Sequence, residues 1–531
     1  MADYQRLRTP LTKMSFTPDV PSNALGTNEY NSGLNVETDV RGIKKIFGEQ
    51  EILTAIPAGP IFMEGGFRSE SSFVYIVATR DSSSHGKWYM VTTAGVTNIT
   101  PGVGGNPSVS LPGYIADLNI TTSWVGNVFF INDTLNNPMY FLPTATEITI
   151  TPDAQWNYDV GVTKTTAGFI RNFCAPNVGN VLVAGNLTKI SGGITSNFPT
   201  TVRWSQSFGL QGVPGTWAPT LTNIANEQEV PVRGPLVDGF FLGGNFFICS
   251  YWDTIVLSPI AYQNSTAPVF GVRLFNQGRG LLNNNCWTNT DQNVYGIDSR
   301  DIWVFDGSNF NSIGNQRVKD YFFSNLNSTY YDRVFMVNNT QKYQIEIYYP
   351  DLTSSGWCNK MLAYRYDLKV WQPPRQVSQA TMATESPRFN ANVPNLATRG
   401  VVYSSYASNQ HLVQKDIGTS FLYNQPISTL FQRNNISFGQ PYSNKVQVHR
   451  ILPEVVGTGN VNITVGGADS VGANITYRPT VKMAIDTNNP WVQIDQNDQR
   501  VVSVKIETTS NVNSYTMTAI NWQNTIIEDD R

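Results

Sequence analysis

Charged side chains are scarce in this sequence. Only 14% of its 531 residues are Asp, Glu, Lys or Arg, and the net charge is −3, whereas roughly 25% charged residues is usual for soluble domains. No strongly basic face is expected, which excludes DNA wrapping by counterion displacement but leaves open the passage of DNA through a channel. Asn, Thr, Ser, Gly and Tyr take the polar positions, a mixture typical of strands and turns. Such a composition fits a protein covered by other subunits or an Asn-rich extracellular protein.

Long apolar segments are also missing. The N-terminus, MADYQRLRTPLTKMSFTPDVP, has no apolar signal-peptide core, and the longest apolar run, residues 237–252, contains Asp and several Gly. That run is too short to cross a bilayer, so the sequence predicts synthesis in a cytoplasm and no membrane insertion. Helical periodicity is nearly absent. The best helix candidate is residues 315–327, in which Val318, Tyr321 and Phe322 share one side.

Cysteine and histidine are rare. The cysteines lie far apart and form no C-x-x-C pair, which favours buried free thiols over disulfides or a zinc site. No two histidines have metal-ligand spacing, and neither a phosphate-binding loop nor a nucleophile elbow occurs. The residues concerned are Cys174, Cys249, Cys286 and Cys358, and His85, His411 and His449.

The carboxylates form no ladder of the kind that binds calcium. Asp298, Asp301 and Asp306 are interpreted as turn residues, and the acidic tail Glu528–Asp530 as a solvated or interface patch. The Gly-rich segment PGVGGNPS, residues 101–108, precedes no helical pattern and is interpreted as a loop. We therefore predict no catalytic residue, no metal site, no cofactor and no enzymatic activity.

Short apolar strands recur along the chain at intervals of roughly 50 to 65 residues, a spacing near that of propeller blades. They are FVYIVATR (73–80), NVFFIN (127–132), NVLVAG (180–185), NFFICSYW (245–252), VYGID (294–298), YQIEIYY (343–349) and VVYSSY (401–406). Each is followed by a second strand, namely KWYMVT (87–92), PMYFL (138–142), TVRW (201–204), TIVLSP (254–259), DIWVF (301–305), LAYRY (362–366) and HLVQ (411–414).

These strands lack the polar alternation of a half-exposed sheet. Ile302, Trp303, Val304 and Phe305 are apolar without interruption, and Asp306-Gly307 then predicts a turn. In a β-propeller each sheet lies between two neighbouring blades, so its inner strands are apolar on both faces. The alternative is a set of β-sandwiches, in which cleaner alternation is expected. The sequence favours an all-β fold, a β-propeller of about seven blade-like units.

The two ends of the chain differ from its middle. Residues 1–55 are rich in turn formers and predict an extended arm, which packs on another part or adds a strand to the last blade. Residues 56–430 form the predicted propeller body. Residues 431–531 show alternating strands and predict a C-terminal β region, either a closing blade or a small sandwich.

Several segments resemble, in their order along the chain, the tail nozzle or hub proteins of short-tailed bacteriophages, a head-to-tail connector stabilisation family. The similarity runs from about Asn31 to Trp371 and extends more loosely over the strands up to Trp522. It is carried by NSGLNVETDVRGIKKIFGE (31–49), TVRWSQSFGLQGVPGTWAP (201–219), VDGFFLGGNFFICSYWDTIVLS (237–258), the Gly-centred segment 274–318 and LAYRYDLKVWQPP (362–374), with Tyr366, Asp367 and Trp371.

The resemblance implies a non-enzymatic structural protein of the virion tail. Members of the family form rings, six-fold in that family, below the portal and adaptor, contact tail fibres or a needle, retain packaged genomic double-stranded DNA and give it a channel for ejection. The alternative is a carbohydrate-binding or glycan-cleaving propeller that acts as a receptor-binding protein, since aromatic rings are plentiful. Residues 204–217 have the Ser, Gly and Trp of a sialidase Asp-box but not its Asp, which weakens the glycosidase hypothesis.

Overall fold

The computed structural model describes most of the chain, and its regular structure is almost entirely β-strand. The described residues are 5–53, 56, 59–80, 86–102, 119–260, 270–387, 400–406, 412–438, 444–470, 473–485, 491–494, 499–509 and 514–527.

Five separate four-stranded antiparallel sheets follow one another along the chain. The first contains β8 (Gly59–Ser69), β9 (Ser72–Arg80), β10 (Gly86–Thr92) and β11 (Gly95–Asn98). The second contains β12 (Thr121–Val125), β13 (Val128–Asn132), β14 (Met139–Phe141) and β15 (Thr149–Ile150). The third contains β16 (Val162–Ala175), β17 (Gly179–Ser191), β18 (Ile194–Trp204) and β19 (Asn226–Glu229). The fourth contains β20 (Leu236–Leu242), β21 (Asn245–Ser250), β22 (Asp253–Pro259) and β23 (Phe270–Gln277). The fifth contains β24 (Trp287–Asn289), β25 (Val294–Ile297), β26 (Ile302–Phe305) and β27 (Phe310–Ser312).

A seven-stranded sheet comes next, and one long strand joins its two halves. The first half of β31 pairs with β30, and its second half, from Ala380 to Glu385, pairs with β32. At the far edge an N-terminal strand, β7, pairs with β33. The strands, in sheet order, are β28 (Phe335–Asn339), β29 (Gln344–Tyr349), β30 (Cys358–Arg365), β31 (Val370–Glu385), β32 (Val401–Ser405), β33 (Leu412–Lys415) and β7 (Glu49–Leu53).

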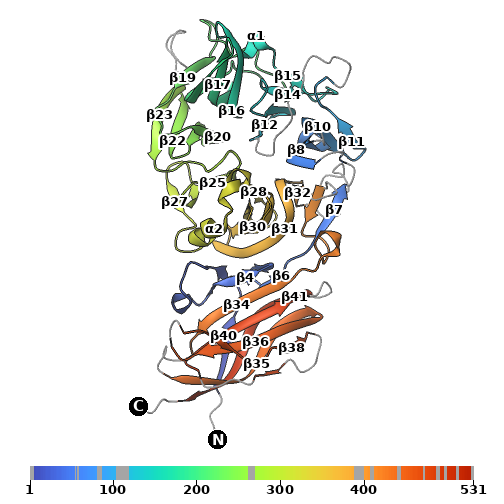
Figure 1. The fold of residues 1–531 in the computed structure, drawn as a ribbon, viewed down its shortest axis with the longest axis vertical. Coiled ribbons are helices and arrows are strands. Elements are labelled where there is room, and N and C mark those ends of the chain that lie inside the picture. The colour runs from blue at the N-terminus through green and yellow to red at the C-terminus, as the bar shows by residue number, and fades with distance from the viewer. Residues whose placement is uncertain are drawn as a thin grey trace.

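The first strands of these sheets are neighbours in space. Strand β12 lies beside β16, β16 beside β20, β24 beside β28, and β28 beside β31. The long β31 in turn lies beside β8, so the last sheet returns to the first. Figure 1 shows these sheets together in the upper part of the molecule, with the C-terminal strands below them. A succession of four-stranded sheets in this order is consistent with a β-propeller.

The strand pairs predicted from the sequence are confirmed. Six of the seven apolar repeats lie on the second strand of their sheet, namely β9, β13, β17, β21, β25 and β29. The seventh lies on β32. Their partners lie on the strands that follow, with His411 of HLVQ outside the described residues. All residues of β13, β25, β29 and β32 are buried, and in β26 only Val304 is partly exposed. Burial on both faces therefore explains the missing polar alternation.

The C-terminal region forms two six-stranded sheets, to which the N-terminal arm contributes strands. One sheet has the order β39-β35-β41-β6-β5, with β1 also paired to β41. The other has the order β37-β36-β40-β34-β4, with β38 paired to β36. The arm strands are β1 (Gln5–Pro10), β4 (Ser32–Leu34), β5 (Val36–Thr38) and β6 (Ile43–Lys45). The C-terminal strands are β34 (Thr429–Ile436), β35 (Lys445–Thr458), β36 (Asn460–Ala468), β37 (Thr476–Tyr477), β38 (Val481–Ala484), β39 (Val492–Gln493), β40 (Val501–Thr508) and β41 (Ser514–Ile527).

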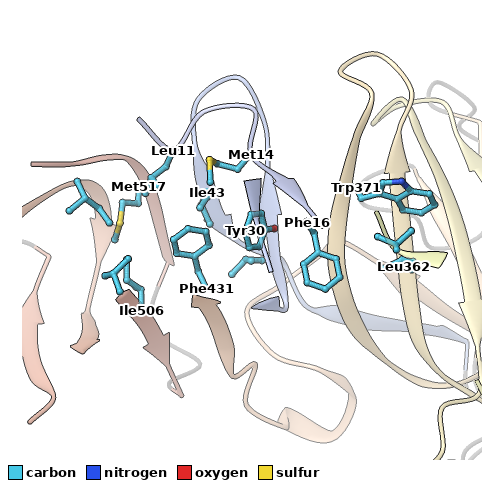
Figure 2. Close-up of a cluster of buried hydrophobic side chains, with 14 of the residues drawn as sticks. Leu11, Met14, Phe16, Tyr30, Ile43, Leu362, Trp371, Phe431, Ile506 and Met517 are labelled. Atoms are coloured by element: carbon cyan, nitrogen blue, oxygen red, sulfur yellow. The ribbon is translucent and has the colours of Figure 1, made fainter. Parts of the chain in front are cut away.

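The arm also joins the two parts of the molecule through a shared apolar core (Figure 2). Between them lies a short parallel pair, β2 (Ser15–Phe16) and β3 (Glu29–Tyr30). The Tyr30 ring lies 5.0 Å from that of Phe431 in β34, and Phe16 belongs to the same buried cluster as Trp371 in β31. Because one continuous core crosses this junction, the propeller and the C-terminal sheets form a single packed body.

A helix forms where the sequence predicts one. The helix α2 (Lys319–Asn325) buries Phe322, and Val318 at its N-terminal end is also buried, while Tyr321 packs against the same core. The only other α-helix among the described residues is the single turn α1 (Asp153–Trp156). Within the described ranges, the helices are all too short and too polar to span a bilayer.

A group of ion pairs fastens the arm to the last propeller sheet. Glu37 in β5 accepts from the Lys342 ammonium at 2.5 Å, and Lys342 also lies 3.0 Å from Asp416, just after β33. Arg375 in β31 pairs with Asp416 at 2.5 Å. Burial alone would raise the pKa of Glu37, but the ammonium groups of Lys342 and Lys44 outweigh it and lower that pKa to about 2.

This lowered pKa makes the contribution of Glu37 to stability dependent on acid. The carboxylate stabilises the fold above its usual pKa near 4.5, and that contribution is lost as the pH falls toward about 2. We expect Glu37→Gln to lower the free energy of unfolding by about 2–3 kcal/mol at pH 7. The difference from wild type should shrink steadily between pH 4.5 and pH 2 in urea titrations. A difference that stays constant over this range would show that ion pairing is not its source.

The predicted turn after β26 has the expected backbone. Asp306 Oδ1 accepts hydrogen bonds from the N–H groups of Ser308 and Asn309, at 2.8 and 2.7 Å. Gly307 has φ 95°, and a Cβ there would meet only Leu242 Cδ2, at 3.7 Å. The space is open, so the constraint on this position is the positive φ.

We expect Gly307→Val to lower the free energy of unfolding by about 1–2 kcal/mol, because a β-branched residue is strained at positive φ. Gly307→Asn should have a smaller effect, since Asn adopts this conformation more readily. Urea unfolding followed by circular dichroism measures both. Equal losses for the two variants would show that backbone strain is not the cause.

Candidate functional site

The first strands of the propeller sheets surround a cavity of about 390 Å³. Its walls come from β8, β12, β16, β24, β28 and β31, so residues far apart in the sequence meet around it. We call it the axial cavity, because the first strands of the propeller-like sheets surround it. The lining side chains on which the site depends are Glu64 of β8, Trp124 of β12, Arg171 of β16, Trp287 of β24, Asn338 of β28 and Glu385 of β31.

One wall of the cavity contains a buried Arg–Asp ion pair that is held by further hydrogen bonds. Arg171 pairs with the fully buried Asp238 of β20 at 2.6 Å and donates to the carbonyl of Thr122 at 2.6 Å. The indole Nε1 of Trp287 donates to the same Asp238 carboxylate at 2.7 Å, and the guanidinium lies 5.3 Å from the Trp287 ring centre. These contacts join the first strands of four sheets, β12, β16, β20 and β24. The Asp238 carboxylate neutralises the charge of Arg171.

Two further carboxyl groups reach the cavity from β8 and β31. Burial raises the pKa of Glu64 to about 7, against the opposing charge of Arg171. Burial also raises the pKa of Glu385, although Thr340 donates to this carboxylate from its backbone N–H at 2.9 Å and from its hydroxyl at 2.5 Å. Both shifts show that the cavity disfavours net negative charge.

Two polar atoms of the cavity residues have no hydrogen-bond partner within the described part of the chain. They are the indole Nε1 of Trp124 and the amide oxygen of Asn338. The Asn338 amide nitrogen donates to the Asn289 carbonyl at 3.0 Å. A Cβ on Gly66 would lie 2.1 Å from the Trp124 ring, so only glycine lets this indole lie against β8. Each unpaired atom raises the free energy of the fold by about 1–3 kcal/mol.

A second cavity, of about 440 Å³, adjoins the first at the ends of β8 and β31. Glu385 lines both cavities. The rings of Phe67 and Tyr343 line the second one and are 40% and 54% exposed. Tyr343 also packs edge-on against Tyr366, with ring centres 5.9 Å apart. The axial cavity thus opens beside an exposed aromatic surface.

The residues singled out from the sequence lie elsewhere. His449 is in β35 and shares a 2.8 Å hydrogen bond with Thr525, whereas His85, His411 and Glu528–Asp530 lie outside the described residues. Across the ranges that the structure covers, no group of three or more His, Cys, Asp and Glu side chains could hold a metal ion. Residues 103–108 of the Gly-rich segment are also outside those ranges.

The turn interpretation of the aspartates is confirmed, but it is incomplete. Asp298 Oδ1 accepts from the N–H groups of Arg300 and Asp301, as in a turn. Asp298 and Asp301 are also buried and both pair with Arg279, at 3.1 and 3.0 Å. The charge of Arg279 allows two acidic groups to be buried close together.

The cysteine prediction is correct for three of the four thiols. Cys249, Cys286 and Cys358 are free and buried. Cys174 is free but exposed, so its predicted burial is wrong. It lies in β16 next to the buried Phe173 and Ala175, on the face of the strand that meets solvent.

Comparison with known proteins gives little further information. No protein-family model matches the chain, and no curated protein matches it. One remotely similar structure is a glycoside hydrolase family 43 arabinoxylan arabinofuranohydrolase from Bacillus subtilis in complex with cellotetraose. Its TM-score is 0.24 at 10% identity, over 90% of this chain and 99% of that chain. Another is the SapL1 lectin in complex with alpha methyl fucoside, with TM-score 0.28 at 11% identity, over 69% and 99%. Likeness at these scores carries no argument about this chain.

Proposed function

We propose that this chain is a structural component of a bacteriophage tail that assembles into a ring, a nozzle or hub. The observation that carries the proposal is an open strand edge. The N-terminal half of β18, from Ile194 to Phe198, pairs with β17 only, because β19 begins to pair at Thr201. Ile194 is 71% exposed, and the nearby Val160 is fully exposed. Soluble proteins protect such edges, so a free edge that carries the exposed apolar side chains of Ile194 and Phe198 is explained best by a partner in an assembly.

The proposed role follows the resemblance in the sequence. The ring, six-fold as in that family, would lie in the virion tail below the portal and adaptor and would contact tail fibres or a needle. Genomic double-stranded DNA would pass through the ring without sequence-specific binding, which suits the low net charge. A propeller body that shares one apolar core with the arm and the C-terminal sheets suits a tail component, which has to be rigid.

The proposal includes the number of blades. We infer seven blades: the five four-stranded sheets, the group β28 to β31, and a last group made by the second half of β31 with β32, β33 and β7. The N-terminal strand β7 would then close the ring of blades as the outermost strand of the last blade. The proposed divisions remain 1–55 for the arm, 56–430 for the propeller and 431–531 for the C-terminal region.

Mass photometry and electron microscopy of the purified full chain test this function, with a closed ring of subunits as the expected result. The variant carrying Ile194→Asp and Phe198→Asp should dissociate while its circular dichroism is unchanged. The control is Val456→Asp in β35, a residue 74% exposed on the C-terminal sheets. A strict monomer at all concentrations would contradict the proposal.

Carbohydrate binding is a second candidate function, and one observation favours it. The axial cavity has polar walls and two carboxyl groups, and exposed aromatic rings lie beside it. Small-ligand sites combine concave shape with a few converging polar groups in this way. If carbohydrate binding is the function, the monomer and the ring should bind saccharides equally well. Saccharide binding can therefore be tested separately from ring assembly.

A further inference from the structure

We propose that the axial cavity binds a neutral polyhydroxylated ligand, a saccharide, whose hydroxyl groups pair with Trp124, Asn338 and Glu64. The inference deepens the second candidate function and is independent of ring assembly. It is a claim about binding alone, in which no covalent bond forms or breaks.

The charges around the cavity favour a neutral ligand. Asp238 already balances Arg171 at 2.6 Å, so this guanidinium is not free to take a second anion. Glu64 and Glu385 would repel an anion, and burial disfavours the charged form of both carboxyl groups. Burial favours the neutral form of Glu64 and Glu385, which weakens the attraction of these two groups for a cation. A neutral ligand avoids each of these penalties.

The hydrogen-bonding groups favour hydroxyls in particular. The unpaired atoms are one donor, on Trp124, and one acceptor, on Asn338, and a hydroxyl group can satisfy either. Both atoms belong to side chains that line the cavity, and both are buried. A hydrogen bond from a ligand hydroxyl to either atom would remove the destabilisation of roughly 1–3 kcal/mol that an unpaired buried atom causes. A protonated Glu64 carboxyl is also donor and acceptor at once, which matches adjacent hydroxyls.

The aromatic rings supply the second half of saccharide recognition. A sugar ring has C–H faces that pack on aromatic side chains while its hydroxyls point to polar groups. Phe67 and Tyr343 present exposed rings in the adjoining cavity, and Glu385 lies between the two cavities. The cavity of about 390 Å³ is within the range of small-ligand sites, roughly 300–1,000 Å³. An oligosaccharide could therefore lie with one residue in the axial cavity and the next against these rings.

Saturation-transfer NMR on the full-length protein tests the proposal with glucose, galactose, mannose, fucose, N-acetylglucosamine and their short oligomers. At least one neutral sugar should show transfer, and an oligomer should bind more tightly than its monomer. Trp124→Phe keeps an aromatic ring but removes the indole N–H, and it should weaken binding at least ten-fold. Tyr343→Ala should weaken the oligomer more than the monomer. The control Trp252→Phe, at an exposed tryptophan outside both cavities, should bind as wild type.

Two results would overturn the proposal. One is the absence of transfer to every neutral sugar, or transfer only to sialylated or phosphorylated sugars. The other is unchanged affinity in Trp124→Phe when its melting temperature shows that it is folded. Mass photometry of the same samples keeps the two functions apart. A protein that forms rings but binds no sugar contradicts carbohydrate binding, and this inference with it, but not the tail role. A sugar-binding monomer contradicts the tail role alone.

Discussion

Lys415→Met is expected to lower the free energy of unfolding by about 3–5 kcal/mol, because it leaves a carboxylate buried without its counter-ion. The Lys415 ammonium pairs with Glu346 of β29, and the two residues are 2% and 0% exposed. Asn339 and Tyr348 still donate to that carboxylate, each at 2.8 Å, but they are neutral. Urea unfolding at pH 7, followed by circular dichroism, measures the loss.

A second variant separates charge from packing. The double substitution Lys415→Met with Glu346→Leu removes both charges, and replacing a whole buried pair by apolar groups is often nearly neutral. We therefore expect the double variant to recover most of the stability that the single variant loses. Lys319→Met is the matched control, because Lys319 and Asp320 form a 3.8 Å pair on the surface and should contribute less than about 0.5 kcal/mol. If the double variant is as unstable as the single one, the loss of unfolding free energy comes from packing and not from the unpaired charge.

The second and third strands of the propeller sheets could be predicted from the sequence because they are buried on both faces. Gln344–Tyr349 and Ile302–Phe305 are examples: the first is buried throughout and the second almost throughout. Burial by neighbouring sheets leaves a continuous apolar run bounded by turns, which is visible without any knowledge of partners. The turn at Asp306 was predictable for the same local reason.

The first strands could not be predicted, although they form the candidate site. Strand β8 mixes Phe and Met with Glu64, Gly65 and Gly66, and its pattern fits neither a buried nor a half-exposed strand. Its polar and small residues line the cavity or make room for the Trp124 ring, and this arrangement depends on five other strands. The useful signal is their position along the chain, because β8, β12, β16, β20, β24 and β28 each end within ten residues of a recognisable apolar strand.

The arm itself was predicted, but its individual strands could not be, for a different reason. Its strands β4, β5 and β6 have only three residues each, too few to show a period. Strands β4 and β6 form because C-terminal strands some four hundred positions or more away offer a free edge, as when Leu34 pairs with Leu430. Strand β5 then pairs with β6. The pairing of Arg171 with Asp238 is likewise set by the fold, since two residues on neighbouring sheets meet only after the sheets are arranged around the axis.

Trp303→Ala is expected to lower the free energy of unfolding by about 3–5 kcal/mol, the usual result of removing a large ring from a packed core. Trp303 lies in β26 and is fully buried. Its ring centre lies 4.9 Å from that of Phe310 and 6.4 Å from that of Phe240 in the preceding sheet. The ring also fills the space above Gly296, where a Cβ would lie 2.3 Å from it. Urea unfolding followed by circular dichroism measures the loss.

Trp303→Phe tests whether the ring volume causes this loss. The indole Nε1 of Trp303 has no hydrogen-bond partner in the described part of the chain, so Phe removes an unsatisfied donor and keeps most of the apolar surface. We expect it to lose less than half as much stability as Ala. Trp252→Ala, at a tryptophan that is 43% exposed, should lose about 1 kcal/mol or less. If Trp303→Ala unfolds like wild type, the ring is not between two sheets, and the packing of neighbouring blades that explains the apolar runs would be wrong.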